Sequence, residues 1–257
     1  MTWWEAVAIL AAGVGAGTIN TIVGSGTLIT FPTLLAFGYA PVTASISNSI
    51  GLVPGGVSGT WGYRPELTGQ RRFLLRLAPA SLLGAVTGAT LLLSLPEEAF
   101  ARIVPVLLAV SVALVIVQPR LQRFLQARRE ARDGAARPTD RSIVAIGGTY
   151  LAGVYGGYFG AAQGVLLIGI LGSLLPEPLQ RVNALKNVLQ VTVNSTAAIF
   201  YTAAAFGRVN WAVVGLISIG SLLGGLVGAR IGRRLPAPVL RTVIVVVGVI
   251  AIWRIVS

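Results

Sequence analysis

The chain has 257 residues, of which 54% are hydrophobic and only 11% are charged, and it carries a formal net charge of +12. Its mean hydropathy of +0.80 indicates too much apolar surface and too little charge for a soluble globular domain. The sequence therefore predicts an integral membrane protein. It contains no cysteine and no histidine, which excludes disulfides, thiolate chemistry and the commonest metal ligands.

Eight apolar runs each approach the length of about 20 residues that a membrane-spanning helix needs. The first run lacks a basic segment before it and a persuasive cleavage site, so we expect a retained helix. Two further runs, Thr27 to Gly38 and Gly164 to Leu175, have 12 residues each and are too short to cross a bilayer alone. The eight long runs are residues 3–23, 41–62, 73–95, 99–118, 142–160, 179–206, 209–231 and 238–256.

The order long, short, long, long, long occurs twice, on either side of a hydrophilic stretch. The segment AGTINTIVGSGTLITFPTLL resembles AGVYGGYFGAAQGVLLIGIL, and ASISNSIG aligns with NALKNVLQ, which pairs Asn48 with Asn187. We therefore expect an internal repeat, a common construction in secondary transporters, although glycine-rich membrane helices can also resemble one another by chance. The expected units are repeat 1 (residues 1–118), a cytoplasmic basic linker (119–141) and repeat 2 (142–257), with both repeats in the membrane.

Arginines gather in three hydrophilic stretches, and basic loops of membrane proteins face the cytoplasm. The loop with Glu97 and Glu98 then lies outside. If each short segment with its neighbouring loop completes a passage, each half makes an odd number of passages, so the second half is upside down. The predicted fold is an all-α polytopic membrane protein of two inverted repeats, each with four long transmembrane helices plus one short broken helix, and with both termini outside. The basic stretches contain Arg64, Arg71 and Arg72, then seven arginines from Arg120 to Arg141, then Arg230, Arg233, Arg234 and Arg241.

A glycine-rich break introduces each short segment: GSGT at Gly24 to Thr27, and GAAQG at Gly160 to Gly164. Non-helical backbone at membrane depth is tolerated only where protein or a water-filled cavity satisfies its polar groups, so such breaks indicate a site. In inverted halves, two short helices would point free N–H groups and positive dipole ends at the midplane, which is a geometry for an anion. The alternative is that these glycines only allow close helix packing.

Lys186 is the only lysine of the chain, and it lies in an apolar segment at the edge of a polar stripe. At about 100° per residue the stripe occupies one side of a helix, and because amides facing lipid are expensive, it should face the bundle interior. Two interpretations of Lys186 remain open: a substrate-facing role, or a stem that stretches from a shallow depth to the cytoplasmic interface. The stripe consists of Asn183, Asn187, Gln190, Asn194 and Tyr201.

All eight acidic residues fall in loops or near the ends of the apolar runs. Without an interior acid, histidine or cysteine, an intramembrane enzyme would lack a base, a nucleophile or a metal, so we expect no enzymatic activity and no cofactor. A purely structural subunit would not need inverted repeats or an aligned amide stripe. A transporter for a small anion fits best, and proton coupling would have to use the substrate, Lys186 or water.

The segments GTINTIVGSGTLITFPTLLAFGYAPVTASISNSIG and GVYGGYFGAAQGVLLIGILGSLLPEPLQRVNALKN resemble the two repeats of the TauE/SafE sulfite exporter family, also called the toluene sulfonate uptake permease family. The resemblance covers essentially the whole chain. It implies a bacterial inner-membrane permease for sulfur-containing oxyanions such as sulfite, or for organosulfonates such as sulfoacetate. A channel-like or metal-linked permease of the same fold with a different small substrate is the alternative.

We expect the anion to bind near the midplane between the two breaks, with access alternating as one half rocks against the other. The expected partners are this anion and the lipid bilayer, without nucleic acid, because the basic residues lie in the gaps between apolar runs. A homo-oligomer is compatible with the sequence, and no metal site is expected. The candidate substrate-binding residues are Ser25, Gly26, Thr27, Ser47, Asn48, Gln163, Gly164, Asn183, Lys186, Asn187, Gln190 and Asn194.

Overall fold

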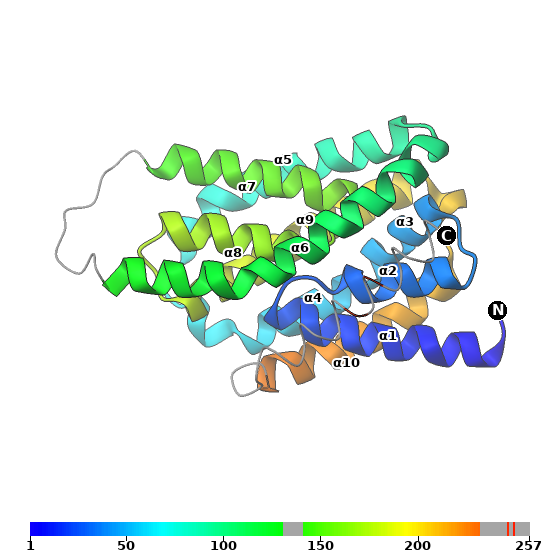
Figure 1. The fold of residues 1–257 in the computed structure, drawn as a ribbon, viewed down its shortest axis with the longest axis horizontal. Coiled ribbons are helices and arrows are strands. Elements are labelled where there is room, and N and C mark those ends of the chain that lie inside the picture. Colours follow the sequence, from blue (N-terminus) through cyan, green and yellow to red (C-terminus); the bar gives the residue numbers. More distant parts are fainter. Residues whose placement is uncertain (131–140, 232–245, 247–248, 250–257) are drawn as a thin grey trace.

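The computed structural model describes residues 1–130 and 141–231, together with positions 246 and 249. Within these ranges the chain folds into helices and turns and contains no strand, as predicted. The helices form an elongated bundle and most of them lie along its long axis (Figure 1). The elements are α1 (Trp3–Ile22), α2 (Thr27–Ala36), α3 (Pro41–Gly51), α4 (Val53–Gly62), η1 (Arg64–Leu67), α5 (Arg71–Ser94), α6 (Glu97–Glu130), α7 (Arg141–Tyr158), α8 (Gln163–Leu174), α9 (Leu179–Ala204), η2 (Phe206–Arg208) and α10 (Trp211–Ile231).

Four of the described helices are long and apolar enough to cross a membrane by themselves: α1, α5, the part of α6 up to Phe124, and α10. The span predicted at 179–206 is the single helix α9, whose polar stripe makes it less apolar. The span predicted at 142–160 is α7, which has 18 residues and includes several glycines and tyrosines. The span predicted at 238–256 lies outside the described residues, apart from positions 246 and 249.

The run at residues 41–62, predicted as one long helix, is two helices of 11 and 10 residues, α3 and α4. The helix is interrupted at Leu52, two residues before Pro54. Proline has no N–H to donate to the carbonyl oxygen four residues earlier, and its ring crowds that carbonyl. The prediction of a continuous helix was therefore wrong in the first half, whereas α9 at the corresponding place in the second half is continuous.

The hydrophilic stretch that begins at Pro119 continues α6 as far as Glu130, and does not start as a loop. Its leucines, glutamines and arginines favour helix. Pro119 lies inside the helix, where it removes a single main-chain hydrogen bond without ending the helix. The residues that follow, 131–140, lie outside the described part of the chain.

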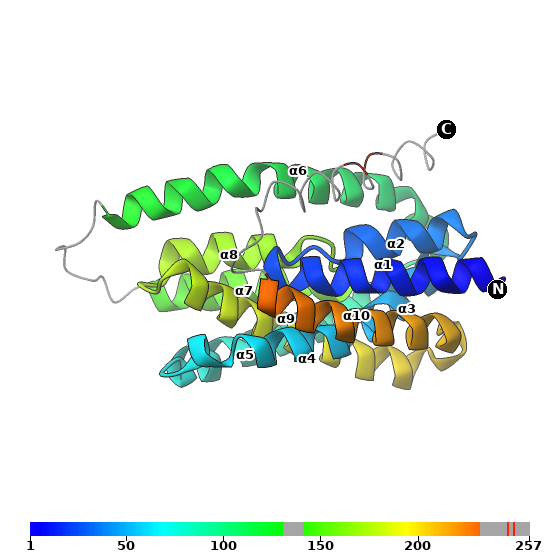
Figure 2. The ribbon, with the colours of Figure 1, turned by 90° about the horizontal axis from the view of Figure 1, so that it is seen from below.

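Each short helix runs back alongside the helix before it. The helix α2 returns towards the end of the bundle at which α1 begins, and α8 returns towards the opposite end, at which α7 begins (Figures 1 and 2). The α1–α2 and α7–α8 connections therefore lie inside the bundle. The element η1 lies at the end where α7 begins, whereas the start of α6, with Glu97 and Glu98, lies at the other end (Figure 1).

Two close helix seams tie the halves together, because α1 packs along α10 and α5 packs along α7. A Cβ added to Gly224 of α10 would lie 2.1 Å from the main-chain oxygen of Val14, and one added to Gly84 of α5 would lie 2.3 Å from that of Tyr150. Val14 and Tyr150 are aligned in the two halves. The same backbone-to-backbone approach thus occurs once in each seam, and small residues make it sterically possible.

An aromatic cluster packs beside the α7–α8 connection. The ring centroids of Phe31 on α2 and Phe159 lie 5.1 Å apart, and the rings meet edge to face. Phe100 on α6 meets Phe159 at 6.2 Å and Tyr158 at 5.6 Å, also edge to face. This geometry suits the charge distribution of aromatic rings, and in a membrane such packing contributes through van der Waals contact.

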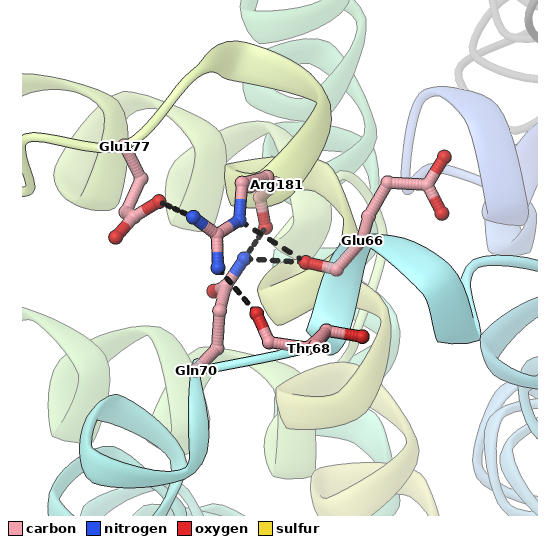
Figure 3. Close-up of polar contacts among 5 residues, drawn as sticks. All are labelled: Glu66, Thr68, Gln70, Glu177 and Arg181. Carbon is pink, nitrogen blue, oxygen red and sulfur yellow. Dashed lines mark hydrogen bonds and ion pairs between the residues drawn. The ribbon is translucent and has the colours of Figure 1, made fainter.

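A second group of contacts ties η1 to the start of α9 (Figure 3). Arg181 forms an ion pair of 2.9 Å with Glu177, and it donates hydrogen bonds to the main-chain oxygens of Glu66 and Thr68. The Gln70 side-chain nitrogen donates to the Glu66 oxygen at 2.8 Å and to the Arg181 oxygen at 3.2 Å. These bonds fix the α4–α5 connection of the first half against the second half.

We predict that Gly224→Ala destabilises the protein, because the new methyl group would overlap the Val14 carbonyl and push α1 away from α10. The expected loss in the free energy of unfolding is about 1–3 kcal/mol, the usual cost of overpacking. Gly215→Ala on the same helix is the matched control, since a Cβ there meets nothing within 4 Å. Thermal unfolding in detergent measures both, and equal melting temperatures would contradict the tight α1–α10 seam.

We also predict that Arg181→Ala lowers the melting temperature, because it removes one ion pair and two hydrogen bonds from a charged donor, each such bond contributing about 1.5–3 kcal/mol. Arg208→Ala is the control. Arg208 lies 3.7 Å from Glu97 with both side chains about half exposed, and exposed pairs contribute about 0–1 kcal/mol. The same unfolding assay should separate the two variants. A larger effect at Arg208 would refute the assignment.

Candidate functional site

The helices α1 and α7, which precede the two breaks, end in the same kind of turn. After α1, Gly24 has a φ of 85° and its N–H donates to the Ile19 oxygen at 3.1 Å. After α7, Gly160 has a φ of 77° and its N–H donates to the Tyr155 oxygen, also at 3.1 Å. Glycine adopts this left-handed conformation without strain and commonly ends helices in this way. The two glycines occupy aligned positions of the two halves.

The two connections meet through their backbones. The N–H of Gly164, in the first turn of α8, donates to the main-chain oxygen of Gly24 at 3.0 Å. A Cβ added to either glycine would lie 2.4 Å from the Cα of the other. No larger residue fits at either position without moving the chain, so this contact fixes the spacing of the two breaks.

Lys186 lies at this contact and is completely buried, with an exposed fraction of 0%. Its Nζ donates to the main-chain oxygens of Asn20 at 3.0 Å and Thr21 at 3.3 Å, in the last turn of α1. Those carbonyls lack intrahelical partners and form the negative end of the helix dipole, so an ammonium is stabilised there. An ammonium has three protons to donate, and these bonds use two. The Lys186 side chain therefore does not reach the surface of the bundle, which excludes the interpretation that its stem stretches to the cytoplasmic interface.

The polar stripe of α9 faces the end of α1 and the first break. The Gln190 side-chain nitrogen donates to the Asn20 side-chain oxygen at 2.8 Å and lies 3.5 Å from the Gly24 oxygen. The Asn183 side-chain nitrogen donates to the Thr21 oxygen at 3.4 Å. Further along α9, Asn194 is also buried. The stripe therefore lies inside the bundle and caps the broken end of α1.

Two of the main-chain donors at the starts of the short helices are taken by the protein itself. The Gly26 N–H donates to the Asn20 side-chain oxygen at 3.3 Å, and the Gly164 N–H donates to Gly24. The sequence had led us to expect free N–H groups at these helix starts. The other break supplies the acceptor for Gly164, and the Asn20 side chain supplies the acceptor for Gly26, so these two N–H groups are engaged within the protein.

The candidate residues of the first half are bonded to one another. The Asn48 side-chain nitrogen donates to the Thr27 hydroxyl at 3.1 Å, and the Thr30 hydroxyl donates to the Asn48 oxygen. Ser47 accepts the main-chain N–H of Asn210 at 3.0 Å, in the connection before α10. Ser47 and Asn48 are therefore engaged in holding helices together.

Several buried polar atoms around the Gly24–Gly164 contact have no hydrogen-bond partner among the described residues. Leaving such a group unpaired costs about 1–3 kcal/mol, and the great majority of buried polar atoms in proteins are bonded. Both donors and acceptors are present. The open atoms are both side-chain amide atoms of Gln163, the hydroxyl of Ser25, the nitrogen of Asn187, and the side-chain oxygens of Asn183 and Gln190. These atoms, together with the third proton of Lys186, make this region the candidate site.

Asn20 was missed by the sequence analysis, although it occupies the centre of this network. Its main-chain oxygen binds Lys186 and its side-chain oxygen accepts from Gln190 and Gly26. The signal was available, since Asn20 is the only amide in the first apolar run and lies four residues before the break. Among the described residues, no group of three or more acidic, cysteine or histidine side chains could hold a metal.

The sequence profile of the family described as "Sulfite exporter TauE/SafE" matches residues 9–255. The chain belongs to this family. Within the TauE/SafE family fold described above, the two breaks and α9 supply the candidate site. No solved structure matches the chain significantly.

Three bacterial relatives extend the comparison. A protein of Escherichia coli K12 named "Probable membrane transporter protein YfcA" is 25% identical over 91% of this chain and 83% of its own length. A Sinorhizobium protein named "Probable membrane transporter protein ORF9" is 27% identical over 91% and 85%, respectively. A "Probable membrane transporter protein" of Haemophilus influenzae is 24% identical over 93% and 89%. This TauE/SafE chain therefore belongs with multi-pass membrane transporters.

We predict that Gly164→Ala disrupts the site, because its methyl group would overlap the backbone of Gly24 and approach the Lys186 side chain. The expected cost is about 1–3 kcal/mol in the free energy of unfolding. Gly169→Ala on the same helix is the control, since its Cβ would meet only the end of the Leu121 side chain. Thermal unfolding in detergent compares them. If the two variants melt together, the breaks are not in close contact.

Proposed function

We propose that this chain is a secondary transporter for small sulfur-containing anions such as sulfite or organosulfonates, sulfoacetate among them, and that it is not an enzyme. One observation carries the proposal: a fully buried ammonium lies among side-chain amides that each keep at least one polar atom without a partner. Lys186 forms no ion pair with a described acidic residue. Because an isolated charge is costly in a low-dielectric interior, a bound anion would stabilise this arrangement.

The choice of sulfur-containing anions rests on the family. Its description names sulfite export, and the three bacterial relatives are named as probable membrane transporters. Donors suited to an oxyanion are present in the site, namely Lys186, Gln163 and Asn187. Because the relatives are bacterial membrane transporters, we infer a location in the bacterial inner membrane. Because the donors are buried, we infer that the oxyanion site lies inside the bundle.

We further infer that residues 1–118 and 142–257 are inverted repeats and that access alternates between the two sides. Three observations support this: α1 and α7 start from opposite ends of the bundle, both end in the same turn, and the α1–α10 and α5–α7 seams share the same close approach. The Gly24–Gly164 contact lies between the two helix hairpins. A change in their relative tilt would open the site to one side or the other.

The distribution of charge supports an orientation. The basic connection with η1 and the start of α5, including Arg71 and Arg72, lies at one end of the bundle, and the start of α6 with Glu97 and Glu98 lies at the other (Figure 1). Arginine-rich connections favour the cytoplasm. We therefore place η1 in the cytoplasm and both termini outside.

The proposal predicts that Lys186→Met abolishes most anion transport. Removing a charged donor costs about 1.5–3 kcal/mol per hydrogen bond, which corresponds to a loss of about tenfold or more. The measurement is sulfite and sulfoacetate flux into proteoliposomes, with saturation and competition between anions recorded to distinguish a transporter from a channel.

Arg208→Gln is the matched control, because it also removes a cation but from an exposed position. Its flux should equal that of the unaltered protein. Folding of both variants is checked by thermal unfolding in detergent. Unchanged flux in a folded Lys186→Met variant would refute the anion role of Lys186, and absence of saturable anion flux in the unaltered protein would refute the proposed function.

A further inference from the structure

Resting on the proposed function, we infer that the site takes the singly charged, still protonated form of an oxyanion, held on the second-half side by Lys186, Gln163 and Asn187. The doubly charged form of the same oxyanion would be excluded, and so would the dianion sulfoacetate, so the inference narrows the proposed substrates to hydrogen sulfite and oxyanions like it. Three observations support this selection: the number of charged groups in the site, the presence of both donors and acceptors without hydrogen-bond partners, and a difference between the two halves in which polar side chains are bonded.

The site provides one positive charge. Lys186 is the only described charged residue in it, and two of its three protons already bind the Asn20 and Thr21 oxygens. The described charged groups of α9 and of the elements packed against it lie near element ends, and none bonds to Lys186: Arg181, Arg64, Glu66, Arg71, Arg72, Arg76 and Arg208.

Two interior tyrosines bond elsewhere, whereas the hydroxyl of the buried Tyr158, beside Phe100, has no partner among the described residues. Tyr155 bonds to the Ser111 hydroxyl and Tyr201 to the Gly157 oxygen. A singly charged anion would therefore neutralise the site. A doubly charged one would leave one negative charge without compensation in a low-dielectric interior, which is strongly unfavourable.

The open polar atoms call for a ligand that both donates and accepts. Gln163 leaves its nitrogen and its oxygen unpaired, Asn187 leaves its nitrogen, and Gln190 leaves its oxygen. A fully deprotonated oxyanion only accepts hydrogen bonds, so it would satisfy the nitrogens and leave the oxygens unpaired. An oxyanion that keeps one O–H group can accept from the nitrogens and also donate to one of the oxygens. Because both atoms of the Gln163 amide are open, rotating that amide does not change this requirement.

The two halves differ at equivalent positions. In the first half, Asn48 bonds to Thr27, the first residue of α2. In the second half, the aligned residues are Asn187 and Gln163, the first residue of α8, and both keep unpaired atoms. The Gln163 amide lies against Gly156, where a Cβ would come within 2.4 Å of its Cδ. The ligand therefore belongs on the second-half side of the Gly24–Gly164 contact.

The test measures binding of three probes to the purified, unaltered protein between pH 6 and pH 8. Sulfite exchanges between its hydrogen form and its dianion over this range, methanesulfonate stays singly charged without an O–H group, and sulfate stays doubly charged. We expect affinity for total sulfite to fall with the hydrogen form, by up to about tenfold per pH unit. Methanesulfonate should bind more weakly than hydrogen sulfite and with constant affinity, and sulfate should bind at least about tenfold more weakly than hydrogen sulfite.

Three results would overturn the inference while leaving the proposed function intact, and the first two concern the charge of the ligand. These two are sulfate binding as tightly as hydrogen sulfite, and sulfite affinity that rises with pH. The third is a methanesulfonate affinity that falls in parallel with that of sulfite, since the titrating proton would then belong to the protein. Failure of all three probes to bind at any pH would refute the proposed function itself.

A matched pair of variants locates the O–H contact. Gln163→Met should remove the preference for hydrogen sulfite over methanesulfonate. Gln118→Met should keep it, because Gln118 is likewise buried with both amide atoms unpaired but lies on α6. An unchanged preference in a folded Gln163→Met variant would contradict the assignment to Gln163. The measurements on the unaltered protein decide the inference if that variant fails to fold.

Discussion

The main-chain contact between Gly24 and Gly164 is the constraint on which the site depends. It holds the broken ends of two helices together at a distance that only glycine allows. With the break fixed, the last carbonyls of α1 have no helical partners, and they attract the ammonium of Lys186. The position of Lys186 then sets the face that α9 turns towards the breaks. One backbone contact thus determines where the polar groups of three helices meet.

The two halves share the same backbone geometry at corresponding positions, but their polar side chains differ. The turns at Gly24 and Gly160 and the two glycine seams follow the same geometry in both halves. The polar residues set into that geometry differ, because Asn48 and Thr27 pair with each other while Asn187 and Gln163 do not. If the proposed repeats are correct, the shared backbone geometry follows from duplication, and the unpaired polar atoms of the second half are the ones that the proposed ligand would use.

The sequence predicted the elements of this site better than their contacts. Glycine breaks and amides within apolar runs are visible in a sequence because both are costly in a membrane unless they are used. The depth of Lys186 was not visible, because it depends on where α1 ends relative to α9. The occupation of the Gly26 N–H was also hidden, since its acceptor, Asn20, reaches it through a turn that only the fold defines. The interruption near Pro54 could have been predicted from the proline alone.

Because the only lysine of the chain is buried at the centre of the candidate site, this protein carries its own chemical reporter. An amine-reactive reagent dissolved in water cannot reach the Lys186 side chain in this conformation, because that side chain has no exposed surface. Modification of Lys186 would thus record each occasion on which the bundle opens to water. The rate of that reaction, followed on the unaltered chain, would time the opening without any added label site.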